Sequence, residues 1–296
     1  MTLLAAPAAG PPGPAGRGRR RRWLIGGTIA WLVVLVAVAV VSAGRDRATV
    51  PDQIDIAAAL PEVDRAAGTV FIAADGVDRV LVVGELQLDR DCDITPVRPG
   101  AEAIRDLTVH VRAGEAPAVL DAIAAALPRS YEVHVSHSRG GTRHLLNADA
   151  GDFVAVDGTV DDTGTVLTLR MSTGCRPLGA GVGPPVTSAG TVQPASQSAA
   201  AQSAALGAAV DAVRLTGRDA VRTREIRCPT GGAARTVEVS GEAAPADLGR
   251  ALNQATAGAT VVEASTDRYA YRTGATSMVV TAFAERATVT ATIGCS

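Results

Sequence analysis

The chain of 296 residues contains no lysine, so all 28 of its basic residues are arginines. Aromatic residues make up only 3% of the sequence, although 47% of all residues are hydrophobic. A buried core must therefore be built mainly from valine, leucine, isoleucine and alanine. An arginine-only basic set with so much alanine, glycine and valine is typical of a GC-rich bacterial genome, which indicates a source and not an activity.

Strong net charge is also lacking, since the formal charge at pH 7 is −2. Five arginines stand in residues 1–43, which contain no acidic residue, and the rest of the chain holds 23 arginines against 30 acidic residues. Proteins that bind nucleic acid or other polyanions use clustered basic side chains. The mildly acidic body therefore argues against a nucleic-acid partner.

The motifs of the common catalytic and cofactor sites are missing as well. The sequence has no CxxC pair, no HExxH, no phosphate-binding P-loop and no GxSxG motif. Gly179, Gly181 and Gly183 repeat with the spacing of part of a dinucleotide-binding fingerprint, but no strand-to-helix unit surrounds them. We therefore expect no enzymatic activity, no metal and no cofactor.

A long hydrophobic run is present near the N-terminus. Residues 1–22 are rich in alanine, proline and glycine and end in an arginine cluster, which predicts a disordered tail. Residues 23–43 carry no charge, and a helix of these 21 residues would span about 30 Å, the thickness of a bilayer core. The preceding arginines predict a cytoplasmic N-terminus, with the rest of the chain outside the membrane.

Two other features of this run leave alternatives open. Residues 41–43 (Val-Ser-Ala) suit a signal peptidase, although a signal peptide usually has a shorter apolar segment. Gly26 and Ala30 have the small-xxx-small spacing with which membrane helices pack, but this spacing is frequent by chance in segments rich in alanine and glycine. We expect an uncleaved single-pass anchor.

An internal repeat organises the chain that follows. The stretches "LTVHVRAGEAPAVLDAIAAAL" (107–127) and "RTVEVSGEAAPADLGRALNQA" (235–255) both run from a strand through Gly-Glu-Ala and a proline into a helix. Apolar residues with period two predict a strand with one buried face, and a 3–4 spacing predicts a helix with one buried stripe. Pro117 and Pro245 lie near the first helical turn, where a missing N–H costs little.

Each unit continues with three further predicted strands. These are 131–138, 152–160 and 164–175 in the first unit, and 260–274, 277–285 and 287–295 in the second. Each unit is therefore predicted to be an α+β module of the order β-α-β-β-β, with a helix on one face of an open, mostly antiparallel sheet. Residues 161–164 (Asp-Asp-Thr-Gly) predict a hairpin turn.

The domain boundaries follow from the repeat and from composition. We expect a first module over 50–176 and a second over 204–296, joined by a flexible linker over 177–203 that is rich in alanine, serine, glycine and proline. The other predicted elements are a helical or irregular segment and a pair of strands before the first unit, and a helix and a strand before the second, at 50–68, 69–88, 204–215 and 220–228.

Four cysteines follow the hydrophobic run, at Cys92, Cys175, Cys228 and Cys295. Disulfides persist outside the cytoplasm, and four cysteines allow three pairings. The repeat selects Cys92–Cys175 and Cys228–Cys295, because each pair brackets one unit. The alternatives are free thiols and a four-cysteine metal site, which usually has closely spaced cysteine pairs.

All four histidines, His110, His134, His137 and His144, fall in the first unit. The spacing of His134 and His137 suggests a metal pair, but strand residues three apart point to opposite faces. His110 takes an outward position that Glu238 matches in the second unit. We expect solvated histidines, with a metal or acid–base site as the alternative.

An acidic cluster, Asp89, Asp91 and Asp93, stands near a strand end. Alternate strand residues share a face, so three carboxylates could converge on Ca²⁺ there. The glycine and the distal glutamate of an EF-hand loop are absent. We therefore expect a solvated strand edge.

Two further polar groups lie in the same unit. Asp157, Asp161 and Asp162 belong to the predicted hairpin, where aspartate is common for reasons of turn geometry, and Ca²⁺ is the alternative. The glycine-containing loop 138–144 holds Arg139 and Arg143 and could bind an anion. We expect a solvated connection between strands.

These features predict a single-pass membrane protein with two disulfide-closed modules outside the membrane. The bilayer is a partner through residues 23–43, and two modules on a flexible linker suit a protein that engages a partner with two surfaces. We expect a non-enzymatic binding or scaffolding module of the bacterial cell envelope, with an envelope protein or ligand as partner. The alternatives are an envelope enzyme or metal-dependent binder that uses the first unit's histidines and aspartates, or a secreted ligand-binding protein cleaved after Ala43.

Overall fold

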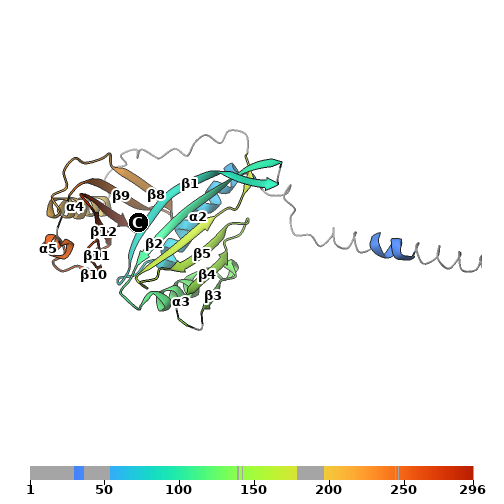
Figure 1. Cartoon of the computed structure of the whole chain (residues 1–296), viewed down its shortest axis with the longest axis horizontal. Coiled ribbons are helices and arrows are strands. Elements are labelled where there is room, and N and C mark those ends of the chain that lie inside the picture. The colour runs from blue at the N-terminus through green and yellow to red at the C-terminus, as the bar shows by residue number, and fades with distance from the viewer. Residues whose placement is uncertain are drawn as a thin grey trace, which may run out of the picture. The chain divides into compact units, whose positions relative to one another are not determined.

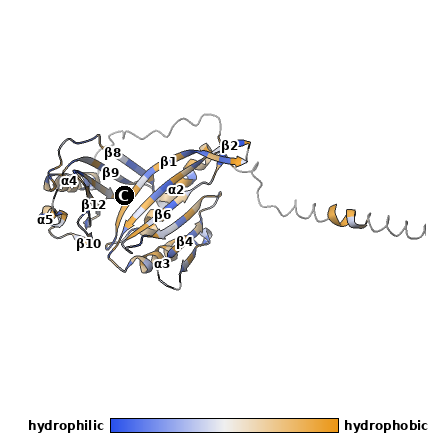
Figure 2. Ribbon diagram, viewed as in Figure 1, coloured by the Kyte–Doolittle hydropathy of each residue, from blue (hydrophilic) through white to orange (hydrophobic). Residues whose placement is uncertain are grey.

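The computed structural model describes residues 30–36, 54–95, 97–138, 140–141, 143–178, 197–243, 245 and 247–295. The chain forms two compact units, residues 1–53 and 54–296. In the first unit, residues 30–36 form a helix of mainly hydrophobic side chains (Figure 2). No helix within the described ranges is long and apolar enough to cross a membrane. The predicted tail 1–22 and most of the predicted membrane segment 23–43 lie outside those ranges.

The first module contains two helices on one face of an antiparallel sheet (Figure 1). Its elements are α2 (Ile56–Ala74), β1 (Val80–Thr95), β2 (Arg98–His110), α3 (Ala116–Ala126), the 3-10 turn η2 (Arg129–Tyr131), β3 (His134–His137), β4 (His144–Asp149), β5 (Ala155–Val160), β6 (Val166–Ser172) and β7 (Arg176–Pro177). The strand order is β1-β2-β6-β5-β4-β3, and β7 pairs with β2. The long β1–β2 hairpin extends beyond the other strands (Figure 1).

The second module repeats this plan. Its elements are α4 (Gln197–Ala212), β8 (Arg222–Arg227), β9 (Ala233–Glu242), α5 (Leu248–Leu252), β10 (Thr260–Ala264), β11 (Arg268–Thr273), β12 (Thr276–Phe283) and β13 (Arg286–Ile293). The strands are again antiparallel, in the order β8-β9-β13-β12-β11-β10. Apart from η2 and the two-residue strand β7 of the first module, both modules therefore have the element order α-β-β-α-β-β-β-β and the same sheet topology.

The α+β class with two antiparallel sheets is confirmed, but each repeat is larger than the β-α-β-β-β unit that the sequence predicted. Each module adds a helix and a strand before the predicted unit and a fourth strand after the second helix. In the first module the added strand is β4, which begins at the end of a segment predicted to be a loop. In the second, the predicted strand 260–274 is two strands, separated by a turn in which Ser265 Oγ accepts from the Arg268 N–H at 3.0 Å.

Residues 69–74 continue helix α2, where the sequence predicted a strand. Thr69, Val70 and Ile72 favour strands by their β-branched side chains. However, a stripe of residues at helical spacing is buried in the core, namely Val63, Ala66, Ala67, Val70, Phe71 and Ala74. Burial of this stripe outweighs the local preference. The helix ends where Asp75 donates its N–H to Phe71 O.

Helix α4 begins at Gln197, inside the segment 177–203 that the sequence predicted to be a flexible linker. Its Gln202 is buried and donates from Nε2 to Arg235 O at 2.9 Å and to Ala291 O at 2.8 Å. These bonds tie the first turns of the helix to strands β9 and β13. Residues 179–196 lie outside the described ranges.

The two modules pack directly against each other. Strand β1, at the edge of the first sheet, lies against one face of the second sheet, and α4 packs on the opposite face. The N–H groups of Leu81 and Val83 donate to Ser277 Oγ and Thr236 Oγ1, both at 3.1 Å. These hydroxyls satisfy donors that an edge strand leaves open. The two modules therefore pack into one body, a point that the sequence left open.

The backbones of the two modules approach closely at Gly68 of α2. A Cβ at this position would stand 1.9 Å from Arg227 O, at the end of β8. Ile226, Cys228 and Ala234 of the second module belong to the same hydrophobic core as α2 and α3. The first module's core is therefore completed by residues of the second module.

The disulfides are Cys92–Cys175 and Cys228–Cys295, the pairing that the repeat predicts. In both, the Cα atoms are 5.9 Å apart. The first ties the β1–β2 hairpin to the chain after β6, and the second ties the end of β8 to the chain after β13. Each disulfide therefore joins the strand that opens a sheet to the end of that module.

Candidate functional site

His110 is buried at the boundary between the modules, so the prediction of a solvated position is wrong. Only 5% of its surface is exposed, and its Nδ1 lies 2.8 Å from Oε2 of Glu263 on β10. Oε1 of Glu263 lies 3.5 Å from Arg268 Nη1. The alternation along β2 correctly placed His110 on the face away from the helices, but the second module covers that face. The contacts of Glu263 with His110 and Arg268 therefore join β2 of the first module to the second module.

The other histidines lie on β3 and β4. His134 and His137 lie on opposite faces of β3, and His134 is exposed. His137 pairs instead with His144 on β4, with 2.7 Å between the two Nδ1 atoms. His137 Nε2 lies 3.1 Å from Asp121 Oδ1 on α3, and His144 Nε2 lies 3.0 Å from Gly141 O. Sequence spacing suggested the wrong pair, because the partner comes from the next strand.

The carboxylates of Asp89, Asp91 and Asp93 are exposed on the β1–β2 hairpin. The pairing of β1 with β2 shifts between Asp89 and Cys92, which interrupts the alternation that would place all three on one face. The Asp91 N–H donates to Asp89 Oδ1 at 2.8 Å, so one carboxylate serves the local backbone. The expectation of a solvated edge agrees with this geometry.

Asp161 organises the β5–β6 hairpin turn. Its Oδ1 accepts from the N–H groups of Thr165 and Val166, both at 3.0 Å, and its Oδ2 accepts from Thr163 Oγ1 at 2.5 Å. Partial burial disfavours the charged form, but the bonds from Thr163, Val166 and Thr165 outweigh it and lower the pKa of Asp161. The Asp161 carboxylate therefore stabilises the turn, the role that its position in a predicted hairpin indicates.

The remaining predicted site residues lie apart from each other. Asp157 accepts from Asn147 Nδ2 at 2.6 Å across β4 and β5, and Asp162 is exposed in the turn. Arg143 is exposed beside β4, and its N–H donates to Ser138 Oγ at 3.0 Å. Arg139 lies outside the described residues. No anion-binding arrangement is built from the part of this loop that the structure describes.

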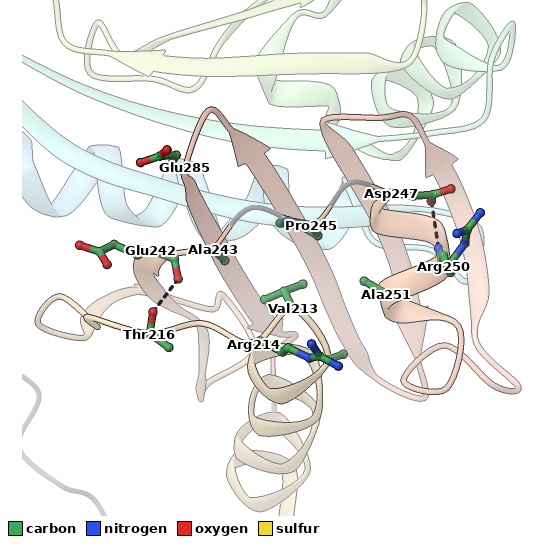
Figure 3. Close-up of a pocket in the computed structure, with 11 residues that line it drawn as sticks. Val213, Arg214, Thr216, Glu242, Ala243, Pro245, Asp247, Arg250, Ala251 and Glu285 are labelled. Carbon is green, nitrogen blue, oxygen red and sulfur yellow. Dashed lines mark hydrogen bonds between the residues drawn. The ribbon is translucent and has the colours of Figure 1, made fainter.

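A hollow of about 740 Å³ opens to solvent on the second module, between the end of α4 and helix α5 (Figure 3). Four segments line it: the end of α4, the end of β9, the start of α5 and the β12–β13 turn. The lining residues are Ala212, Val213, Arg214, Thr216, Glu242, Ala243, Pro245, Asp247, Arg250, Ala251 and Glu285.

The backbone at the end of α4 forms one wall of the hollow. Arg214 has φ +55°, in the left-handed region that commonly follows a helix but favours glycine. The chain then returns to pair with the end of β9, where Thr216 N donates to Glu242 O at 2.9 Å and Glu242 N donates to Thr216 O at 2.8 Å. Arg214 is therefore fixed at a reversal of the chain.

Helix α5 forms the opposite wall. It has five residues, and Asp247 caps it by accepting from the Arg250 N–H at 3.0 Å. In the first module the corresponding helix, α3, has 11 residues and joins α2 in one core. The shorter helix leaves space beside α4.

The hollow carries charges of both signs. Glu242 and Glu285 lie on the side away from Arg250, and Arg214 lies between (Figure 3). Within the described part of the chain, the side chains of these four residues form no ion pair or hydrogen bond with another residue. Their charged groups are therefore available to bind a ligand.

Sequence analysis missed this hollow because its lining comes from four separate segments. One signal was present: the first unit reads Gly-Glu-Ala-Pro over 114–117, and the second reads Gly-Glu-Ala-Ala-Pro over 241–245. In the first module Gly114 and Glu115 lie in the turn before α3, whereas Gly241 and Glu242 are the last residues of β9. The extra residue marks where the two copies diverge.

Tyr271 and Arg176 are two of the buried groups whose pKa values are shifted, and both have structural roles. Burial raises the pKa of Tyr271 to about 12, with a smaller contribution from Tyr269. Burial lowers the pKa of Arg176, which Asp152 partly offsets. The Arg176 guanidinium donates to the carbonyl oxygens of Thr173, Ile54 and Asp152. No group of three or more His, Cys, Asp or Glu side chains in the described ranges could hold a metal ion.

Comparison with solved structures finds a crystal structure of a DUF4853 family protein from Actinomyces odontolyticus ATCC 17982. The two chains are 13% identical with a TM-score of 0.33, and the match covers 64% of this chain and 96% of that one. A likeness at this level supports no statement about function. No protein-family model and no curated protein matches the chain.

Proposed function

We propose that the protein is a single-pass, membrane-anchored binding module of the bacterial cell envelope, with its ligand site in the hollow of the second module. The observation that carries this proposal is the hollow itself, about 740 Å³ in volume and lined by unpaired charges of both signs. The uncharged run 23–43 after an arginine cluster supports the anchor, and the two disulfides support a location outside the cytoplasm.

The charge arrangement suits a ligand with a cationic group and an anionic group, such as a short peptide with free termini. Glu242 and Glu285 would receive the cationic group, and Arg214 and Arg250 the anionic one, since guanidinium groups bind carboxylates in a bidentate way. All four side chains are exposed, so each contact contributes little and is screened by salt. We expect weak binding that weakens further at high ionic strength.

Site-specific photo-crosslinking tests the ligand site. A photo-reactive residue placed at Thr216, on the wall of the hollow, should form an adduct with an envelope component in living cells. The matched control is the same residue at Thr159, which is exposed on β5 of the first module. The Glu242→Gln/Glu285→Gln variant should lose the adduct. Equal adducts at both positions, or none at Thr216, would contradict the proposal.

The anchor is tested separately by fractionation and N-terminal sequencing of the full chain. An anchored protein should stay in the membrane pellet after extraction at alkaline pH and should retain the residues before 23. Release into the medium with a new N-terminus at Gly44 would instead support a secreted binding protein. The sequence also left open a metal-dependent binder, and His137 and His144 are the histidines that the structure pairs for such a role.

A further inference from the structure

We propose that His137 and His144 form a binding site for a divalent transition-metal ion, held between their two Nδ1 atoms. The Nδ1 atoms face each other at 2.7 Å, while protein oxygens engage both Nε2 atoms. The site lies on the first module and uses no residue of the hollow. It therefore stands independently of the proposed ligand site.

Regular elements place the two rings. His137 and His144 are directly opposite each other in the β3–β4 pair, two register steps from Val135 and Leu146 and therefore on the same face. Leu146 is fully buried, so the strand beside His144 is held by the core. Helix α3 packs on the same face of the sheet and presents Asp121 to His137. A site on strands and a helix is more rigid than one on loops.

The hydrogen bonds of His137 and His144 leave no donor for the contact between their Nδ1 atoms. Asp121 Oδ1 and Gly141 O accept hydrogen bonds, so His137 Nε2 and His144 Nε2 must both donate. The Nδ1–Nδ1 contact needs a third proton, because two lone pairs would otherwise face each other. The geometry therefore calls for a proton or a metal cation between the two Nδ1 atoms.

A metal ion can take the place of the shared proton. Neutral imidazole nitrogen is a preferred ligand of Zn²⁺, Ni²⁺ and Cu²⁺. Histidines that bind metals usually donate their other N–H to a carboxylate or a backbone carbonyl, which are the roles of Asp121 and Gly141 here. On binding, the ion accepts both Nδ1 lone pairs, and one proton leaves to solvent.

Space for the ion requires a small movement at an open edge. Zinc–nitrogen bonds are about 2.0–2.1 Å long, so the two Nδ1 atoms would separate to roughly 3–4 Å. The His137 side chain lies on the edge strand β3 and is 38% exposed. With two protein ligands, water completes the coordination, and we expect modest affinity that follows the order Cu²⁺ above Ni²⁺ and Zn²⁺.

Calorimetric titration of the full chain in detergent with ZnCl₂ tests the site. We expect one ion bound and release of about one proton, read from the heats in two buffers of different ionisation enthalpy. His137→Gln and His144→Gln should each weaken binding by at least about 10-fold, and Asp121→Asn by about 10-fold. His134→Gln is the matched control, an exposed histidine on the same strand, and should leave binding unchanged.

Three outcomes would overturn the proposal: no Zn²⁺ binding by the wild type, unchanged affinity in His137→Gln, or an equal loss in His134→Gln. The histidine Cε1–H resonances of the wild type give a measurement that needs no variant. Zn²⁺ should shift two of the four, and a shift of His134 or His110 in their place would also exclude the site. Failure of the crosslinking experiment at Thr216 would not alter these results.

Discussion

The two modules share one sheet topology, but different faces of their sheets are buried. In the first, α2 and an α3 of 11 residues cover one face of the sheet, and the other face carries exposed polar residues such as Thr159 and Arg170. In the second, α4 covers one face and β1 of the first module packs on the other, so Thr276–Val280 of β12 are all buried. Both faces of the second sheet are thus covered around β12, and its short helix α5 leaves an open hollow beside α4.

The difference shows that two copies of one topology can bury different faces of their sheets. Hydroxyl side chains at buried positions of the second sheet, Thr236 and Ser277, bond to the backbone of β1. On the outer face of the first sheet, Asp106 and Arg170 form a bidentate ion pair at 2.9 and 3.1 Å that remains close to solvent. Packing partners, and not topology, therefore decide the role of each sheet.

Removing the disulfides should give the largest effects. The linked cysteines are 83 and 67 residues apart, so the chain-entropy model predicts nearly equal losses of about 4.5 kcal/mol of unfolding free energy. Urea denaturation of Cys92→Ser/Cys175→Ser and Cys228→Ser/Cys295→Ser measures both. Because Cys228 also lies in the first module's core, Cys228→Ser/Cys295→Ser should lose at least as much unfolding free energy as Cys92→Ser/Cys175→Ser. A larger loss from the first pair would contradict the shared core.

Gly68→Ala should separate α2 from β8. The new Cβ would meet Arg227 O at 1.9 Å, and a backbone clash of this kind costs about 3 kcal/mol. Gly207→Ala in α4, the corresponding helix of the second module, is the matched control, because its Cβ meets nothing within 4 Å. It should stabilise the protein by about 0.5–1 kcal/mol. Thermal unfolding of both variants tests the contrast, and equal effects would contradict the packing described.

Alkaline pH should weaken the core of the second module through Tyr271. Its folded-state pKa is raised to about 12, above the usual 10, so the phenol's contribution is complete below pH 10 and is lost as the pH rises toward 12. Unfolding free energy should fall by about 1.4 kcal/mol per pH unit in this window. Tyr271→Phe should flatten that fall. The absence of lysine removes the usual competing titration, so urea unfolding from pH 9 to 11 isolates the tyrosines.

The smallest effects should come from the hydroxyls that meet β1. Thr236→Val and Ser277→Ala each leave one buried N–H of β1 without a partner, at a cost of about 1–2 kcal/mol. Thr159→Val, on the exposed face of the first sheet, should change stability by less than about 0.5 kcal/mol. Hydrogen exchange should also speed up at Val83 in Thr236→Val and at Leu81 in Ser277→Ala. Unchanged exchange there would show that these bonds do not protect the edge.

The sequence predicted what depends on local pattern and on the repeat. The α+β class, the hairpin turn at Asp161 and the pairing of the four cysteines follow from periodicity, turn chemistry and duplication. The strand predicted from residue 69 was wrong, because burial of Val70 and Phe71 in the helical stripe of α2 outweighed their strand preference. Strand β4 was missed, because its few apolar residues follow a loop rich in glycine and arginine.

Contacts between modules could not be predicted from either module alone. The face of β2 that carries His110 was predicted correctly, but burial of that face depends on Glu263, which lies 153 residues away in the chain. Likewise, the partner of His137 is set by strand register across the β3–β4 pair. Such features depend on tertiary register, for which a single sequence carries no periodic signal.

The shared core also has a consequence for the order in which the protein folds. Helices α2 and α3 bury their apolar side chains together with Ile226, Ala234 and, partly, Cys295. The N-terminal half therefore cannot complete its interior while the C-terminal half is still being synthesised. Folding of residues 54–295 should be one late, cooperative event, and incomplete forms should be prone to aggregation until β8, β9 and the second disulfide are in place.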